Sequence, residues 1–167
     1  MIYRKGTIQD VEGIKAMYLE VARVLGGLAR KESEITNEYI ENWTSKSLKN
    51  GLWMVAEDST KSLVGSIHAY PLEPIVFCHV LTELTIAVHP LSQGRGVGKW
   101  LFQHFLEEVR INCPSILRVE LIARESNQKA IRLYESLGFQ QEGRFMGRIK
   151  SVGNGFESDI PMAWLRK

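Results

Sequence analysis

The sequence predicts an α/β (α+β) fold, in which helices cover both faces of a mixed sheet. Apolar patterns with helical spacing alternate along the chain with strand-like apolar runs. A glycine-rich segment, "QGRGVGK", joins one such run to an amphipathic helix pattern. The 167 residues are 44% hydrophobic and 24% charged, which suffices for one globular domain with a sizeable core. We therefore expect a single domain over residues 1–167.

Composition argues against several classes of protein. The formal net charge is only +2 and the basic residues are scattered, which disfavours a nucleic-acid partner. The two cysteines lie outside any CxxC pair, so we expect buried thiols in a reducing compartment. The N-terminus lacks the apolar core of a signal peptide, and no stretch approaches the roughly 20 apolar residues of a membrane span. We expect a cytoplasmic protein without membrane association.

The N-terminal third should contain one strand and two helices. A strand over residues 2–7 precedes a helix that begins near Asp10, the usual type of capping residue. The apolar residues of this helix recur at helical spacing: Val11, Ile14, Met17, Tyr18 and Val21. A second, more polar helix is expected over residues 36–49, ended by Gly51.

The middle of the chain should form a hairpin, a long strand and a helix. Residues 52–58 and 63–70 predict paired strands, and an extended run follows over 75–89. A helix over 96–112 ends before Pro114. We expect its buried side to carry Val97, Trp100, Leu101, Phe105, Leu106 and Val109.

The C-terminal third should add three strands and one helix. The patterns predict a strand over 117–123, a helix over 128–137, and closing strands over 139–150 and 156–165.

The glycine-rich segment fails two common phosphate-binding patterns. A dinucleotide fingerprint requires G-x-G-x-x-G, and a nucleoside-triphosphatase loop requires Ser or Thr after Gly-Lys, where Trp100 stands. A strand that runs into a glycine-rich helix start still presents unpaired amides and a helix dipole to an anion. Arg95 and Lys99 add positive charge. A plain glycine turn before an amphipathic helix is the alternative.

Two motifs in register resemble the GCN5-related N-acetyltransferases. Residues 93–98, "QGRGVG", match that family's Q/R-x-x-G-x-G/A signature, and residues 127–139, "NQKAIRLYESLGF", look like its N-x-x-A-x-x-x-Y-x-x-x-G-F motif. The tail over 155–165 is similar to that of small bacterial members, some of which acetylate amino acids or protein N-termini. The resemblance implies a twisted, mostly antiparallel mixed sheet of about seven strands that splays between the fourth and fifth.

The resemblance also implies acetyl-CoA as co-substrate, with its pyrophosphate on the glycine loop. Ile86 and Val88 would contact its pantetheine arm through main-chain atoms. Asn127 would cap a helix and touch the arm, and Lys129 would reach a phosphate unless it is an ordinary solvated helix charge. The full implied set is Ile86, Ala87, Val88, Gln93, Gly94, Arg95, Gly96, Val97, Gly98, Lys99, Asn127 and Lys129.

Glu83 is the candidate general base. Strand alternation places Glu83, Thr85 and Ala87 on one face, with Leu84, Ile86 and Val88 on the other, in the core. At about 3.3 Å per residue Glu83 lies roughly 10 Å along the strand from Ile86, so a bridging water is expected. A surface glutamate at a strand end is the alternative.

Tyr134 matches the family's general acid, which we interpret first as a hydrogen-bond donor to the leaving thiolate. The alternative is a packing role, since Tyr134 falls in a helical stripe with Ala130, Leu133 and Leu137.

The expected function is acetyl transfer from acetyl-CoA to a primary amine of a small molecule (an amino acid or polyamine-like) or a peptide N-terminus, by direct attack. A non-catalytic acyl-CoA sensor is the alternative. By resemblance residues 24–43 shape the acceptor pocket. Four glutamates in this segment attract a cationic amine or are merely solvated. An apolar pocket lined by Trp43, Trp53 and Tyr70 is the equal alternative. The histidines show no metal-ligand spacing, so no metal is expected. The resemblance admits a homodimer.

Overall fold

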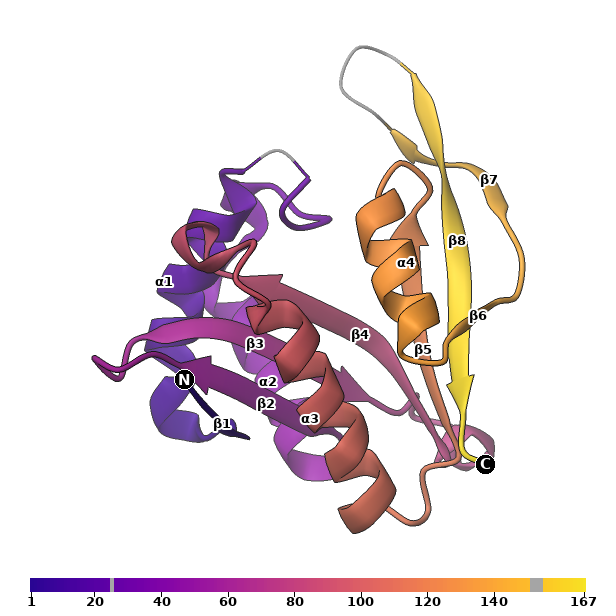
Figure 1. Cartoon of the computed structure of the whole chain (residues 1–167), viewed down its shortest axis with the longest axis horizontal. Helices are drawn as coiled ribbons and strands as arrows, with labels where there is room; N and C mark the ends of the chain where they lie inside the picture. The colour runs from indigo at the N-terminus through magenta and orange to yellow at the C-terminus, as the bar shows by residue number, and fades with distance from the viewer. Residues whose placement is uncertain (25, 151–154) are drawn as a thin grey trace. The chain divides into compact units, whose positions relative to one another are not determined.

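Strands and helices alternate along the chain in the expected order (Figure 1). The computed structural model describes residues 1–24, 26–150 and 155–167; Leu25, within the expected acceptor segment, lies outside them. The strand order is β1-β2-β3-β4-β5-β8-β6, with β7 also paired to β8. The β4–β5 pair is parallel and the sheet is otherwise mostly antiparallel. The predicted mixed sheet is confirmed, and it has eight strands within these residues in place of about seven.

The chain forms two compact units, which are described separately. The first comprises Met1–Tyr70 and Thr85–Cys113, and the second comprises Pro71–Leu84 and Pro114–Lys167. In the first unit β1 (Ile2–Lys5) pairs with β2 (Leu52–Glu57), and β2 pairs with β3 (Leu63–Tyr70). The predicted hairpin is therefore confirmed.

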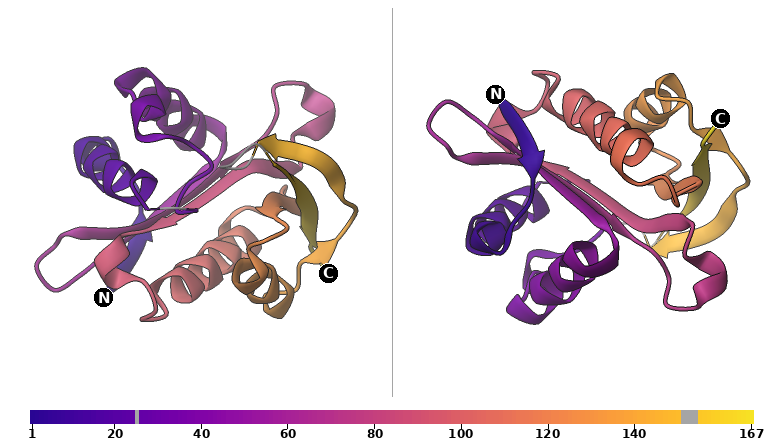
Figure 2. Two further views of the ribbon diagram at one scale, coloured as in Figure 1. Left: turned by 90° about the horizontal axis from the view of Figure 1, so that it is seen from above. Right: turned by 90° about the horizontal axis from the view of Figure 1, so that it is seen from below.

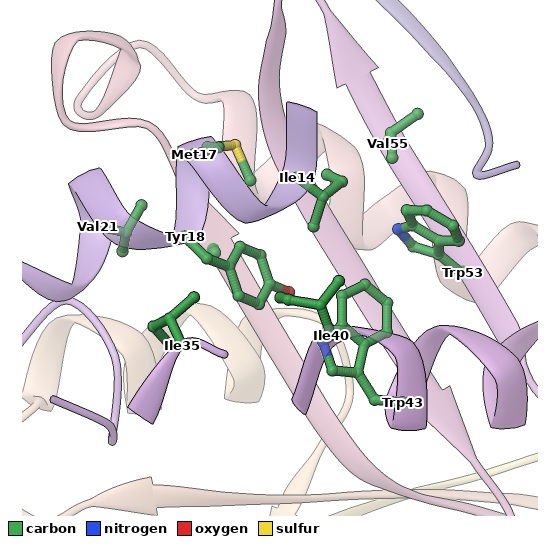
Figure 3. Packing of buried hydrophobic residues seen from close by; sticks show 10 residues of the cluster. Ile14, Met17, Tyr18, Val21, Ile35, Ile40, Trp43, Trp53 and Val55 are labelled. Carbon is green, nitrogen blue, oxygen red and sulfur yellow. The ribbon is translucent and has the colours of Figure 1, made fainter. Parts of the chain in front are cut away.

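Helices α1 (Val11–Ala22) and α2 (Asn37–Asn50) cover one face of the strands in the first unit (Figure 2). The helix α2 begins where Thr36 accepts a hydrogen bond from the Tyr39 amide through its hydroxyl. Both helices bury their apolar sides in one cluster with β2 and the end of β4 (Figure 3). The cluster consists of Ile14, Met17, Tyr18, Val21, Ile35, Ile40, Trp43, Trp53, Val55 and Ala87.

Helix α3 (Val97–Asn112) covers the opposite face (Figure 2). Its buried residues are Val97, Leu101, Phe102, Phe105, Leu106 and Val109. Trp100, expected on this side, is 55% exposed, and Phe102 takes its place in the core. A helix turns once per 3.6 residues, so the row 97, 101, 105 and 109 faces inward with 102 and 106, and position 100 falls outside that arc.

The extended run expected over residues 75–89 is a strand only from β4 (Val80–Val88) onward. Ile75–Phe77 instead form a single 3-10 turn after Pro74, in which the amides of Phe77 and Cys78 donate to the carbonyls of Pro74 and Ile75. This turn leaves Cys78 exposed, which corrects the expectation that both thiols are buried.

In the second unit β5 (Arg118–Arg124) pairs with β8 (Phe156–Leu165) over seven residue pairs. The parallel ladder between β4 and β5 has only two pairs, Val80 with Arg118 and Leu81 with Val119. The ladder ends at Leu81 and Val119, and the predicted splay between the fourth and fifth strands stays a prediction.

The strand expected over 139–150 is divided into β6 (Gln140–Gln141) and β7 (Phe145–Lys150). Both pair with β8, but the register gains one residue between Gln141 and Phe145. The Glu142 amide donates to the Pro161 carbonyl, and Pro161 has no N–H to return. In a strand the amide and carbonyl of one residue point to the same side, so the missing N–H of Pro161 is on the side of β8 that faces Glu142. The ladder is therefore interrupted between β6 and β7.

Candidate active site

The loop between β4 and α3 is tied to the end of β4. The His89 amide donates to the Val64 carbonyl, and a 3-10 turn (Pro90–Ser92) follows. The Gln93 side-chain amide donates to the Val88 carbonyl at 3.0 Å. Gln93, predicted as a cofactor contact, therefore has an observed role in holding the loop.

Gly94 and Gly96 are the two positions in this loop that require glycine. Their φ angles are 75° and 81°, in the left-handed region that L side chains rarely adopt. Gly96 is the N-cap of α3, whose first backbone hydrogen bond runs from the Trp100 amide to the Gly96 carbonyl. The amides of the first turn therefore have no acceptor within the helix.

Gly98 lies in that first turn and packs against β4. A Cβ at this position would lie 3.4 Å from Val88 Cγ2 and 4.0 Å from Ile86 Cδ1. Ile86 and Val88 are half-buried on this face, whereas Ala87, only 2% exposed, packs in the α1–α2 cluster. The expectation that Leu84, Ile86 and Val88 form the core face is wrong, because all three are half-buried and Ala87 of the other face is the buried residue.

The loop has the shape and charge to fit a diphosphate. A Cβ on Gly94 would meet no atom within 4 Å, so its surroundings are open. Arg95 and Lys99 are exposed beside it. Unpaired helix amides, a helix dipole and two cations are the donor set that a phosphate group requires. The residues present therefore fit the pyrophosphate of acetyl-CoA.

Glu83 lies on β4, two residues beyond the end of the β4–β5 ladder, and is exposed. Its φ is 52°, a left-handed conformation that is uncommon for a residue other than glycine. This conformation interrupts the regular alternation of side chains along the strand. The simple two-face reading of residues 83–88 is therefore wrong at Glu83. Such strained backbone is often found at functional positions.

Tyr134 lies on α4 (Gln128–Ser136) and is half-buried. Its ring centroid lies 6.1 Å from that of Phe139, and burial raises the pKa of its hydroxyl to about 12. The phenol therefore retains its proton at neutral pH. The buried residue of α4 is Ile131, which was not part of the predicted packing stripe. The residues of that stripe, Tyr134 among them, are half-buried.

The other two predicted cofactor residues in the second unit are also on or next to α4. Asn127 caps the helix, since its side-chain oxygen accepts from the Ala130 amide at 3.2 Å, which confirms the predicted cap. Lys129 is exposed. The predicted residues are thus grouped as 86–88 and 93–99 in the first unit, and Glu83, Asn127, Lys129 and Tyr134 in the second.

The alternatives for the acceptor segment are partly decided. Trp43 and Trp53 are 1% and 2% exposed and belong to the core, so they do not line an open wall. Tyr70 is half-buried. The four glutamates are exposed. They are Glu32, Glu34, Glu38 and Glu41.

Two residues for which the sequence predicted no site role stand out in the structure. Trp100 is exposed at the start of α3, and His68 is 2% exposed within the α1–α2 side of the core. Helical spacing alone would have placed Trp100 outside the buried arc, whereas no sequence signal marked His68. Within the described residues no cluster of three or more His, Cys, Asp or Glu has the arrangement of a metal site. No helix in the same residues is long and apolar enough to span a bilayer.

Several known proteins are similar to this chain in sequence. The ribosomal protein bS18-alanine N-acetyltransferase of Salmonella typhimurium is 39% identical over 87 residues, and the spermidine N(1)-acetyltransferase of Vibrio cholerae is 30% identical over 92. These matches cover 50% and 55% of this chain, and 57% and 51% of the relatives, so the chain spans little more than half of their length.

The fold itself matches over nearly the whole chain. The crystal structure of a ribosomal-protein-alanine N-acetyltransferase from Brucella melitensis has a TM-score of 0.85 at 20% identity, covering 99% of this chain and 100% of that one. The sequence model of the acetyltransferase (GNAT) family matches residues 14–139. The chain therefore belongs to the acetyltransferase (GNAT) family.

Proposed function

We propose that the protein is an acetyl-CoA-dependent N-acetyltransferase that acts on a primary amine. The observation that carries this proposal is the loop before α3, where two left-handed glycines precede unpaired helix amides and the space at Gly94 is open. Family membership supports the same function. In this proposal acetyl-CoA supplies an activated acetyl thioester.

The chain holds this co-substrate mainly through backbone atoms. The amides at the start of α3 bind the pyrophosphate, and exposed Arg95 and Lys99 oppose its charge. Main-chain groups of residues 86–88 position the pantetheine arm. Their side chains are already engaged in packing, which agrees with a backbone role. Asn127 and Lys129 contact the arm and a phosphate, respectively.

Glu83 and Tyr134 handle the protons. An amine attacks a thioester only in its neutral form, and exposed Glu83 accepts the proton of the ammonium through a bridging water. Tyr134 donates a hydrogen bond from its hydroxyl to the sulfur as negative charge develops there. The raised pKa of this hydroxyl favours a donor role over complete proton transfer.

The acceptor is a small-molecule amine, of the amino-acid or polyamine class, or a peptide N-terminus. Relatives are named for ribosomal-protein alanine and for spermidine, and this range supports a primary amine without selecting one. Of the exposed glutamates in α2 and the segment before it, Glu32 is paired with Arg23, and the other three favour a cationic acceptor. The second candidate, a non-catalytic acyl-CoA sensor, shares the loop but has no use for Glu83 and Tyr134.

Thiol release from acetyl-CoA tests the proposal directly. The panel contains amino acids, polyamines, aminoglycosides and N-terminal peptides, and calorimetry measures acetyl-CoA binding in parallel. We expect binding, and thiol release with at least one amine. Binding without release across the whole panel would favour the sensor, and no binding at all would refute both.

A further inference from the structure

Trp100 differs from the other tryptophans of the chain. Trp43, Trp53 and Trp164 are 1%, 2% and 5% exposed, whereas Trp100 is 55% exposed. An indole combines a large apolar face with one N–H donor, and tryptophan is enriched in binding sites for that reason. The folded unit has no packing requirement for this ring, because the buried side of α3 is filled by other residues.

The indole lies directly beside the proposed phosphate loop. A Cβ on Gly96 would lie 3.5 Å from Trp100 Cδ1 and 3.6 Å from Nε1. The pyrrole edge of the ring is therefore in van der Waals range of the left-handed residue that precedes the first helical amides. The indole would tolerate a Cβ at this distance, so it is the left-handed turn, with φ 81°, that favours glycine at position 96.

Neighbouring rings continue this surface along α3. His104 Nδ1 lies 2.7 Å from the Trp100 carbonyl oxygen, and its ring centroid lies 6.5 Å from that of Trp100. The opposite neighbour of His104 is Tyr3 of β1, stacked at 4.6 Å with an interplanar angle of 18°. Two elements of the first unit therefore support a row of rings that ends at the loop.

We propose that Trp100 is a stacking platform for the adenine ring of acetyl-CoA. This inference rests on the proposed function and specifies how the nucleotide end is recognised. In coenzyme A one ribose joins adenine to the pyrophosphate, so a diphosphate on the loop amides brings the purine close to the next exposed ring. Purines stack on aromatic side chains, and exposed Lys99 beside Trp100 opposes the nearby phosphates.

Binding measurements with three ligands test the platform. Calorimetry compares wild type with Trp100→Ala for coenzyme A, for adenosine 3′,5′-bisphosphate and for 4′-phosphopantetheine, which lacks the nucleoside. Loss of one stacked base weakens binding about tenfold or more. We expect that loss for coenzyme A and the bisphosphate, unchanged affinity for phosphopantetheine, and partial retention in Trp100→Phe.

Tryptophan fluorescence gives a second readout that is independent of turnover. Because the other three indoles are buried, acrylamide quenches mainly Trp100. Adenosine 3′,5′-bisphosphate should shield this emission in wild type and leave that of Trp100→Phe unchanged. Ile111→Ala is the matched control, since Ile111 is a 66% exposed apolar residue three turns further along α3 and should bind all ligands as wild type does.

The outcomes separate the two proposals. Unchanged affinity of Trp100→Ala for the bisphosphate, or an equal loss for phosphopantetheine, would overturn the platform while leaving the enzyme proposal intact. Absence of coenzyme A binding in the wild type would refute the proposed function and the platform together. A folded Trp100→Ala, verified by circular dichroism, is required for each comparison.

Discussion

Tyr134 has two properties that suit a donor to sulfur: a half-buried ring and a hydroxyl whose pKa burial raises to about 12. Tyr134→Phe should lower kcat about 10²-fold with KM for acetyl-CoA nearly unchanged, because the lost hydrogen bond strengthens only as charge develops. Steady-state kinetics with two thioesters of different leaving-group pKa measure this. The defect should be smaller for the thiol of lower pKa.

The same variant separates the donor role from packing. Phenylalanine keeps the ring beside Phe139, so the free energy of unfolding should change by no more than about 1 kcal/mol. A normal kcat would return Tyr134 to a packing role. Equal defects with both thioesters would mean that its hydroxyl does not assist the sulfur.

Glu83 is tested by its amide analogue. Glu83→Gln preserves side-chain size at an exposed position, so acetyl-CoA affinity should remain near that of the wild type. Loss of a general base should lower kcat at pH 7 by about 10²-fold, with recovery at high pH as the amine deprotonates unaided. A pH–rate profile measures this, with Glu73→Gln, an exposed glutamate of the same unit, as control. Unaffected turnover at pH 7 would make Glu83 a surface residue.

The loop that joins β4 to α3 can be tested separately through its affinity for acetyl-CoA. Gly94→Val places a side chain in the open space beside the loop amides, and should weaken acetyl-CoA binding more than tenfold by displacing the pyrophosphate. Gly26→Val is the matched control, because Gly26 has φ 78° and also has nothing within 4 Å of its Cβ position. Both variants incur a left-handed penalty of about 1–2 kcal/mol. Equal calorimetric affinity in the two would contradict the loop assignment.

Elements whose identity depends on local patterns were predictable, and those decided by a partner strand were not. Periodicity located α1, and Gly51 marked the end of α2. The break between β6 and β7 arises from Pro161 on the neighbouring strand, which local sequence does not reveal. Trp100 was predicted on the buried side of α3 because it is apolar. Its angle around the helix axis places it outside the buried arc, and it is exposed.

For the whole molecule, the motifs identified the family and the order of elements but not the environment of single residues. The left-handed φ of Glu83 occurs two residues beyond the end of the β4–β5 ladder, which joins two strands far apart in sequence. The burial of Ala87 depends on helices from the N-terminal third. The roles of the site residues remain predictions, whereas the left-handed φ angles of Gly94 and Gly96 are observed.

Because His68 is buried, we expect the free energy of unfolding of the chain to depend on pH. Its ring stacks on Trp43 at 3.8 Å, its Nδ1 lies 3.3 Å from the Tyr18 hydroxyl, and burial lowers its pKa to about 3. The folded state therefore keeps His68 neutral at pH values where an unfolded histidine, with a pKa near 6.5, takes up a proton.

Between about pH 6.5 and 3 the unfolded chain binds the additional proton, so the free energy of unfolding should fall as pH decreases, by up to about 1.4 kcal/mol per pH unit for this one group. Carboxylates contribute at the acid end, so the informative range is pH 7 to 5. Denaturant unfolding across that range should show the slope in wild type and a shallower slope in His68→Phe, which keeps a ring against Trp43. The comparison uses the slope and not the absolute stability, because the variant also loses the contact with Tyr18. Identical slopes in the two proteins would mean that His68 does not couple protonation to unfolding.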